Sequence, residues 1–167
     1  MGKHGMTDAY EEKFQASLQY QDFVSDQLRK KYGIILGIYS SYEYQIKFGE
    51  SASGIEVKYD RRMAETGNIY IETHEKTRPE NPEFVKSGIY REDGTWAWLI
   101  GDYEKAFLFA KNQLIHLHQQ TQFYEMRQIK EVENPTSKGI LLPAKVAIER
   151  LICIRQFTFL KGEHLGK

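Results

Sequence analysis

Two glutamates and a lysine stand close together around a segment with a strict two-residue period. Charged and apolar residues alternate in Ile55–Asp60, so a β-strand here places Glu56 and Lys58 on one face. Glu50 precedes Glu56 across a Ser-Ala-Ser-Gly turn, and a tight connection would bring the two carboxylates together. With the carbonyl of Val57 they form a hard oxygen site of the kind that holds Mg²⁺ and several waters. The ammonium of Lys58 would lie beside those waters, where it can hold or deprotonate a nucleophilic water or neutralise a phosphate.

These residues resemble the active-site motif of the PD-(D/E)XK nuclease superfamily, the restriction-endonuclease-like proteins, in its small phage or prophage form. That motif is an acid at a strand end, a turn, and Glu-x-Lys on the next strand, after an N-terminal helix. The resemblance implies that Glu50 and Glu56 bind a divalent metal and that Lys58 serves the attacking water. It also implies Mg²⁺ as the cofactor, for which Mn²⁺ is expected to substitute, and DNA as the partner.

The resemblance implies two further site residues. Members of the family often carry another carboxylate on the following strand, and Glu72 takes that position here. Many members also carry a Glu on the N-terminal helix that faces the site. In this chain that slot is filled by Gln21, with Asp22 beside it. We therefore expect Glu72 and Gln21 to assist Glu50, Glu56 and Lys58 in catalysis.

A different interpretation of the same strand is an exposed sheet face on which Glu56 and Lys58 form an ordinary surface ion pair. The tripeptide Glu-x-Lys occurs a second time at residues 11–13, within the start of a helix, where it has only solvated side chains. The strand, together with Glu50 before it and Glu72 after it, is what favours a metal site.

Basic residues follow the Glu-x-Lys strand directly and gather at the end of the chain. Arg61 and Arg62, together with Lys111, are candidate contacts to DNA phosphates. The chain has 23 basic and 23 acidic residues and a formal net charge of zero, which excludes a generally polybasic nucleic-acid coat. Residues 138–167 nevertheless hold six Lys or Arg against two Glu. This asymmetry fits a DNA-facing surface, although helix solubility explains it nearly as well.

The order of elements predicts an α/β (α+β) class, with a restriction-endonuclease-like mixed central sheet flanked by helices, in a single nuclease-like domain over residues 1–167. The pattern predicts helices over Asp8–Tyr32, residues 103–117 and residues 143–152. It predicts strands over Ile34–Tyr39, Ile55–Asp60, Asn68–His74, Thr95–Ile100 and, at a sheet edge, Lys138–Leu142, with a further alternating segment at Tyr42–Phe48 and a loop or lid at Thr77–Gly94.

The cysteine content and the apolar runs of the sequence bear on the cellular location of the protein. The single cysteine, Cys153, cannot form an internal disulfide or a cysteine-rich zinc site. No apolar run is long enough to cross a membrane, and the first residues lack the core of a signal peptide. We therefore expect a cytoplasmic location and no membrane partner.

The sequence thus predicts a metal-dependent DNA endonuclease. Cutting both strands would favour a homodimer, because one site cuts one strand. One alternative is a non-catalytic module on the same fold that binds nucleic acid or protein. Another is a small-molecule-binding domain in which Trp96, Trp98 and Tyr103 line a pocket.

Overall fold

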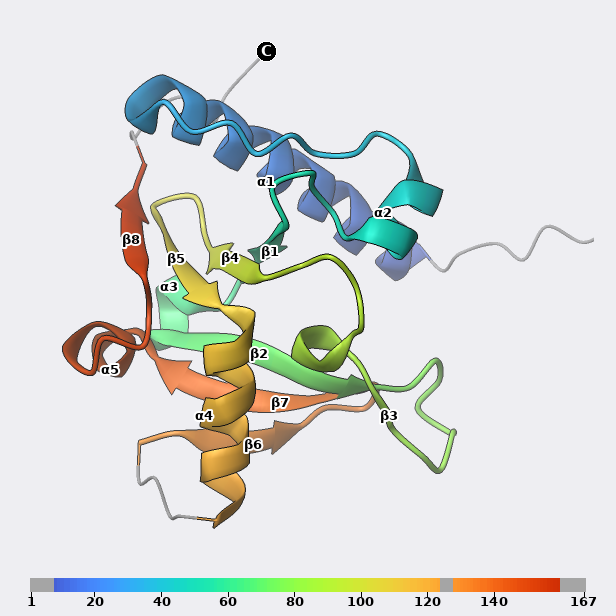
Figure 1. Ribbon diagram of the computed structural model, residues 1–167. Helices are drawn as coiled ribbons and strands as arrows, with labels where there is room; N and C mark the ends of the chain where they lie inside the picture. Colours follow the sequence, from blue (N-terminus) through green and yellow to red (C-terminus); the bar gives the residue numbers. More distant parts are fainter. Residues whose placement is uncertain (1–7, 124–127, 160–167) are drawn as a thin grey trace, which may run out of the picture.

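The computed structural model describes residues 8–123 and 128–159, which form helices and strands in two sheets and confirm the α+β class (Figure 1). The helices are α1 (Asp8–Tyr32), α2 (Tyr42–Phe48), α3 (Met63–Thr66), α4 (Lys111–Phe123), α5 (Ala144–Glu149) and the short 3-10 helix η1 (Gly88–Tyr90). The strands are β1 (Ile55–Tyr59), β2 (Asn68–Glu75), β3 (Val85–Lys86), β4 (Ala97–Gly101), β5 (Lys105–Ala110), β6 (Lys130–Glu133), β7 (Ser137–Pro143) and β8 (Arg155–Thr158).

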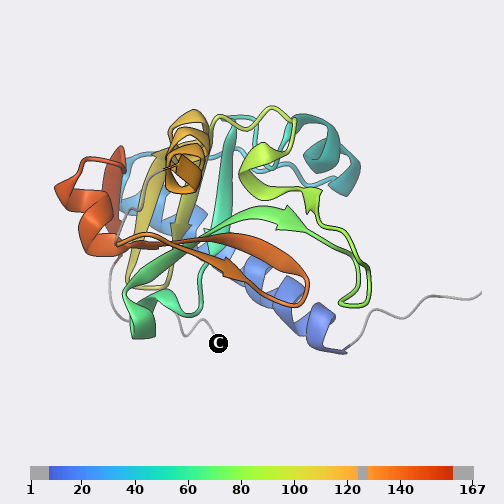
Figure 2. The same cartoon turned by 90° about the horizontal axis from the view of Figure 1, so that it is seen from below.

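The mixed sheet has the strand order β1-β4-β5-β8, with β1 parallel to β4 and the other pairs antiparallel. The second sheet, β3-β2-β7-β6, is antiparallel throughout. Figure 2 shows β2 and β7 running together across the strands of the mixed sheet. The strands are therefore divided between two crossing sheets, and β1, which carries the Glu-x-Lys residues, lies at an edge of the mixed one.

Helix α1 covers one face of the mixed sheet. Its apolar stripe of Tyr20, Val24 and Leu28 packs with β-strand residues that include Val57 and Leu99. The helix ends as its sequence predicts, because a glycine with φ of 67° follows Tyr32 and its amide bonds back to the last turn. This docking fixes the position of α1 beside β1.

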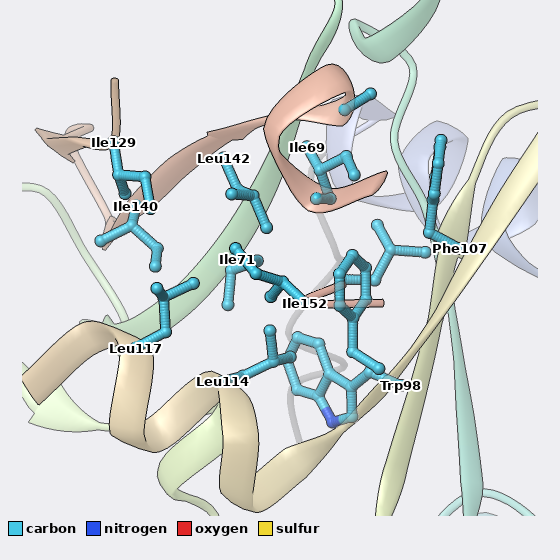
Figure 3. Packing of buried hydrophobic residues seen from close by; sticks show 14 of the residues in the cluster. Ile69, Ile71, Trp98, Phe107, Leu114, Leu117, Ile129, Ile140, Leu142 and Ile152 are labelled. Carbon is cyan, nitrogen blue, oxygen red and sulfur yellow. The ribbon is translucent and has the colours of Figure 1, made fainter. Parts of the chain in front are cut away.

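The other face of the mixed sheet packs against the second sheet and α4. Figure 3 shows apolar side chains of β2 and β7 meeting two leucines of α4 and two aromatic side chains of the mixed sheet. The labelled set includes Ile69, Ile71, Ile140, Leu142, Leu114, Leu117, Trp98 and Phe107. A core on both sides explains why β4 is buried along its whole length.

Three sequence predictions about the first half of the chain are confirmed, and two are wrong. The helix over residues 8–32 and the strands over residues 55–60 and 68–74 are present, with shifts of a residue at their ends. Ile34–Tyr39 forms only an isolated bridge between Ile38 and Ser51, since Ile35 is exposed and the following glycine has a positive φ. The alternating segment Tyr42–Phe48 is the helix α2.

The second half departs further from the sequence patterns. Residues 103–117, predicted as one helix, instead contain β5 and the start of α4. The strand was not predicted because β5 is covered on both faces, and periodicity does not distinguish its apolar run from a helix. Strand β7 lies between β2 and β6 rather than at an edge. The last predicted helix ends at Glu149, and β8, which no pattern indicated, follows. Thr77–Gly94 is largely loop, with β3 and η1 inside it.

No helix in the described ranges combines the length and the apolar character that crossing a membrane requires.

Candidate active site

Strand β1 directs its charged and apolar side chains to opposite faces. Val57 packs under α1, whereas Glu56 and Lys58 lie on the face of their β4 neighbours Trp98 and Ile100. The Glu56 side chain is only 4% exposed and the Lys58 side chain is 43% exposed. Lys58 Nζ lies 2.5 Å from Glu56 Oε1 and 5.3 Å from the centroid of the Trp98 ring. Because the carboxylate is buried, the pair is not an ordinary surface ion pair.

Glu50 returns to β1 as the sequence predicts. The turn after it is held by Ser51, whose hydroxyl donates to the carbonyl of Ile55 and accepts from its amide. The amide of Val57 donates to Glu50 Oε1 at 3.3 Å, and the side-chain amide of Gln21 donates to the same oxygen. Helix α1 and the turn therefore place Gln21 and Glu50 beside the Glu-x-Lys strand.

The Val57 carbonyl points to the same side as Glu50. The amide of Asp60 donates to Gly101 and the carbonyl of Gly54 accepts from Ala97, so the even-numbered residues of β1 bond to β4. In a parallel ladder the odd-numbered residues then direct their amide and carbonyl groups to the free edge. The edge of β1 thus presents a backbone oxygen next to a carboxylate.

Burial makes the negative charge of Glu50 unfavourable. It raises the pKa of this carboxyl to about 7, an effect that Glu56 reinforces and that Lys58 and the hydrogen bonds from Gln21 and Val57 oppose. A divalent cation would relieve this cost, so the donor set of two carboxylates and one carbonyl fits Mg²⁺ or Mn²⁺, with waters completing the shell. Among the described residues no group of three or more His, Cys, Asp or Glu is arranged to hold a metal by itself.

Lys58 stays protonated at this site. Burial lowers its pKa, but the charges of Glu56 and Glu50 outweigh that effect and the net shift is upward. An ammonium can donate hydrogen bonds to a water or a phosphate, but it cannot accept a proton. Of the roles that the sequence left open, the upward shift favours positioning and charge neutralisation over deprotonation of water.

Glu72 and two arginines surround a pocket that opens in front of Lys58. The pocket has a volume of about 420 Å³, and its lining includes Lys58, Glu72, Arg61, Arg62 and Trp98. Glu72 accepts a hydrogen bond from Ser87 at 3.2 Å, and burial raises the pKa of its carboxyl. Arg61 is 44% exposed and lies 3.6 Å from Glu12 of α1. The structure therefore places Glu72, Arg61 and Arg62 around one opening.

Lys111 does not lie on the open surface. Its side chain is 11% exposed and its ammonium lies 3.1 Å from Asp93 Oδ1, with a second hydrogen bond to the carbonyl of Arg91. Lys111 is the first residue of α4, directly after β5, and does not lie in the middle of a helix. This pairing and low exposure do not favour the expected contact of Lys111 with DNA phosphates, which stays a prediction.

Arg91 and Asp93 belong to the site, and the sequence analysis missed both. Arg91 Nη2 lies 3.4 Å from Glu56 Oε2, and its Nε donates to Asp93 Oδ2 at 2.7 Å. Both residues follow η1, which packs tightly on β2. A Cβ on Gly88 would lie 2.1 Å from the carbonyl oxygen of Glu72, so only glycine permits this approach. The feature of the sequence that could have indicated Arg91 and Asp93 is their position just before β4, the strand that pairs with β1.

The three aromatic residues considered for a small-molecule pocket are separated. Trp98 is buried in the core, whereas Trp96 is exposed and its indole N–H donates to the carbonyl of Ser53. Tyr103 packs against Tyr20 beneath α1. This separation removes the basis for a small-molecule site formed by the three.

The site thus combines the buried carboxylate of Glu56, the half-buried carboxylate of Glu50 and a fixed lysine, next to an open pocket that two arginines border. Such an arrangement can bind a divalent cation and an anionic substrate side by side. No family model, curated protein or solved structure matches the chain in the comparisons with known proteins.

Proposed function

We propose that the protein is a metal-dependent deoxyribonuclease that hydrolyses phosphodiester bonds, on the pattern of the PD-(D/E)XK superfamily. The observation that supports this proposal is the meeting of Glu50, Glu56 and Lys58 at the edge of β1, beside a pocket that can admit a phosphate. Helix α1, the Ser51 turn and strand β1 all contribute to this arrangement, so the proposal does not depend on the Glu-x-Lys tripeptide alone.

Glu50, Glu56 and the carbonyl of Val57 would hold the metal ion. A bound Mg²⁺ supplies polarisation of the phosphate and a lower pKa for a coordinated water. Gln21 fixes the orientation of Glu50 by its hydrogen bond, and Lys58 donates hydrogen bonds to the attacking water or to the phosphate oxygen on which charge grows. Glu72 lines the same pocket, where a carboxylate can orient a second water.

Cleavage of DNA tests the proposal. Supercoiled plasmid, a single-stranded oligonucleotide and a four-way branched duplex are each incubated with the protein in Mg²⁺, in Mn²⁺ and in EDTA. We expect at least one substrate to be cut with metal and none in EDTA. If all three remain intact in both metals, the nuclease proposal is wrong. Because one site cuts one strand, we also propose that a homodimer makes any double-strand break.

Arg61 and Arg62 are expected to supply phosphate contacts. Replacing both with alanine should weaken binding to duplex DNA and lower the magnitude of the slope of log K against log salt by about 2, since each contact contributes about 0.9. Fluorescence anisotropy in Ca²⁺, at several salt concentrations, measures both quantities.

A double replacement of Arg29 and Lys30 controls for net charge. These residues lie in the last turn of α1, where both pair with Asp26. Their variant should keep the wild-type slope. Equal slopes for all three proteins would contradict a phosphate role for Arg61 and Arg62.

One observation favours a second candidate, a non-catalytic nucleic-acid-binding module on this fold. Glu56 already has two cationic partners, Lys58 and Arg91, which neutralise it without a metal. Such a module would keep the DNA binding of Arg61 and Arg62 but take up no metal. Calorimetric titration with Mn²⁺ separates the candidates, because the nuclease must bind the ion and the module must not.

A further inference from the structure

Arg91 occupies an oxygen of Glu56 that the proposed metal site needs. Lys58 takes Oε1 at 2.5 Å and Arg91 takes Oε2 at 3.4 Å, so both carboxylate oxygens face a cation. A divalent ion that binds Glu56 must therefore compete with one of the two side chains.

The distances indicate which contact yields. Charge-assisted N–H···O bonds have lengths of about 2.7–2.9 Å, so the 3.4 Å contact of Arg91 to Glu56 is a weak one. The bond from Arg91 Nε to Asp93, at 2.7 Å, is of full strength. Arg91 is thus held firmly at one end of its guanidinium and loosely at the other.

Asp93 is a stable anchor for this arrangement. Burial raises the pKa of its carboxyl, but hydrogen bonds from Arg91, the amide of Thr95 and Lys111 outweigh that effect and lower the pKa to about 2. Asp93 therefore stays ionised throughout the neutral range. Since Lys111 also contacts Asp93, the anchor keeps one cationic partner whatever Arg91 does at Glu56.

The side chain of Arg91 is partly exposed to solvent, which leaves space for its guanidinium to change partners. Its side chain is 47% exposed, in contrast to the buried carboxylates of Glu56 and Asp93 that it bridges. A guanidinium presents five donors in a planar fork, so Nη groups that leave a carboxylate can bind a phosphate without loss of the Nε bond.

We infer that Arg91 is a built-in counter-ion of the metal site, which neutralises Glu56 until a divalent cation binds and then serves as a phosphate ligand tethered by Asp93. The inference rests on the proposed function, because it concerns control of the same site. It gives the site two charge states: the metal-free state with Arg91 on Glu56, and the metal-bound state with Arg91 free for DNA.

The inference predicts opposite effects of one substitution on two measurements. In Arg91→Met the competing charge is absent, so Mn²⁺ should bind the DNA-free protein about 2–5-fold more tightly, in line with a partly exposed ion pair. Cleavage at saturating metal should fall about 10–100-fold, because a phosphate ligand is lost. Calorimetry with Mn²⁺ and a single-turnover cleavage assay provide the two numbers.

Two control variants test whether the effects are specific to Arg91 and to its guanidinium group. Arg29→Met removes an arginine that is also paired with an aspartate, at 2.9 Å, but at the far end of α1. It should leave both measurements unchanged. Arg91→Lys restores the charge, so the Mn²⁺ affinity should return toward the wild-type value while cleavage recovers only in part, because lysine lacks the fork. Melting temperatures confirm that each variant is folded.

The outcomes distinguish the inference from the proposed function. Tighter Mn²⁺ binding with slower cleavage supports the inference. If Arg91→Met binds Mn²⁺ with the wild-type or a lower affinity, while the wild-type protein binds metal and cuts DNA, the inference is overturned and the nuclease proposal stands. If the wild-type protein neither binds Mn²⁺ nor cuts DNA, both are overturned.

Discussion

Replacement of Lys58 by methionine is expected to lower the rate of DNA cleavage by about 10²–10³-fold, which is the usual effect of removing one well-placed electrostatic group from a site. The ammonium lies 2.5 Å from Glu56, a proposed metal ligand, and lines the neighbouring pocket. Methionine keeps an unbranched stem that can rest on the Trp98 ring, so the local packing is largely retained. Single-turnover cleavage at saturating Mg²⁺ measures the loss.

Metal and DNA binding separate this effect from general damage. Lys58→Met removes a cation from beside Glu56, so the affinity for Mn²⁺ should be equal to or higher than that of the wild-type protein. DNA binding in Ca²⁺ should change little, because Arg61 and Arg62 remain. Lys145→Met is the control, since Lys145 is 82% exposed on α5 and pairs with Glu149 of the same helix. A Lys58→Met protein that cuts at the wild-type rate would rule out the assigned role.

Replacement of Glu50 by glutamine is expected to abolish metal binding and, above pH 7, to stabilise the metal-free protein. The folded-state pKa of about 7 lies above the ordinary value of 4.5. Between these values the folded state holds a proton that the unfolded state has lost, so the stability of the wild-type protein decreases as the pH rises through this window. Glutamine remains neutral and avoids the decrease, and its carbonyl can still accept from Gln21 and Val57.

Melting curves in EDTA test this expectation. At pH 5 the two proteins should melt at similar temperatures, and at pH 8 the Glu50→Gln protein should be more stable by about 1–2 kcal/mol, or several degrees. Glu65→Gln, on the exposed surface of α3, should show no such difference. A Glu50→Gln protein that is less stable at pH 8, or that binds Mn²⁺ as the wild-type protein does, would contradict the account.

The proposed metal uptake by the wild-type protein should have a pH dependence of the same origin. Below pH 7 the Glu50 carboxyl is mostly protonated, and the metal must displace that proton. The affinity for Mn²⁺ should therefore increase from pH 6 to pH 8 and level off above it. Lys58 is ionised throughout this range and adds no step of its own.

The local part of the site was predictable from the sequence because it depends on short-range geometry. The period of two in β1 sets the faces of Glu56 and Lys58, and the Ser51 turn sets the return of Glu50. These features follow from backbone periodicity and one tight turn, without knowledge of the tertiary fold.

Long-range features were not predictable in the same way. Arg91 reaches Glu56 from a loop 35 residues later, which is held near β1 by tertiary contacts such as the close packing of Gly88 on β2. Lys111 was expected to contact phosphate, whereas the fold brings its ammonium 3.1 Å from Asp93, 18 residues earlier in the chain. The apolar run of β5 has no period because both of its faces are covered, and that burial is a property of the whole fold.

The proposed metal-dependent role of Lys58 in DNA cleavage is tested most directly by the initial rate of plasmid nicking by the wild-type and Lys58→Met proteins, side by side, in Mn²⁺ and in EDTA. We expect nicking by the wild-type protein in Mn²⁺ only, and a rate about 10²–10³-fold lower for Lys58→Met although it still binds Mn²⁺ and DNA. Intact plasmid with the wild-type protein, or equal nicking by the two proteins, would contradict it.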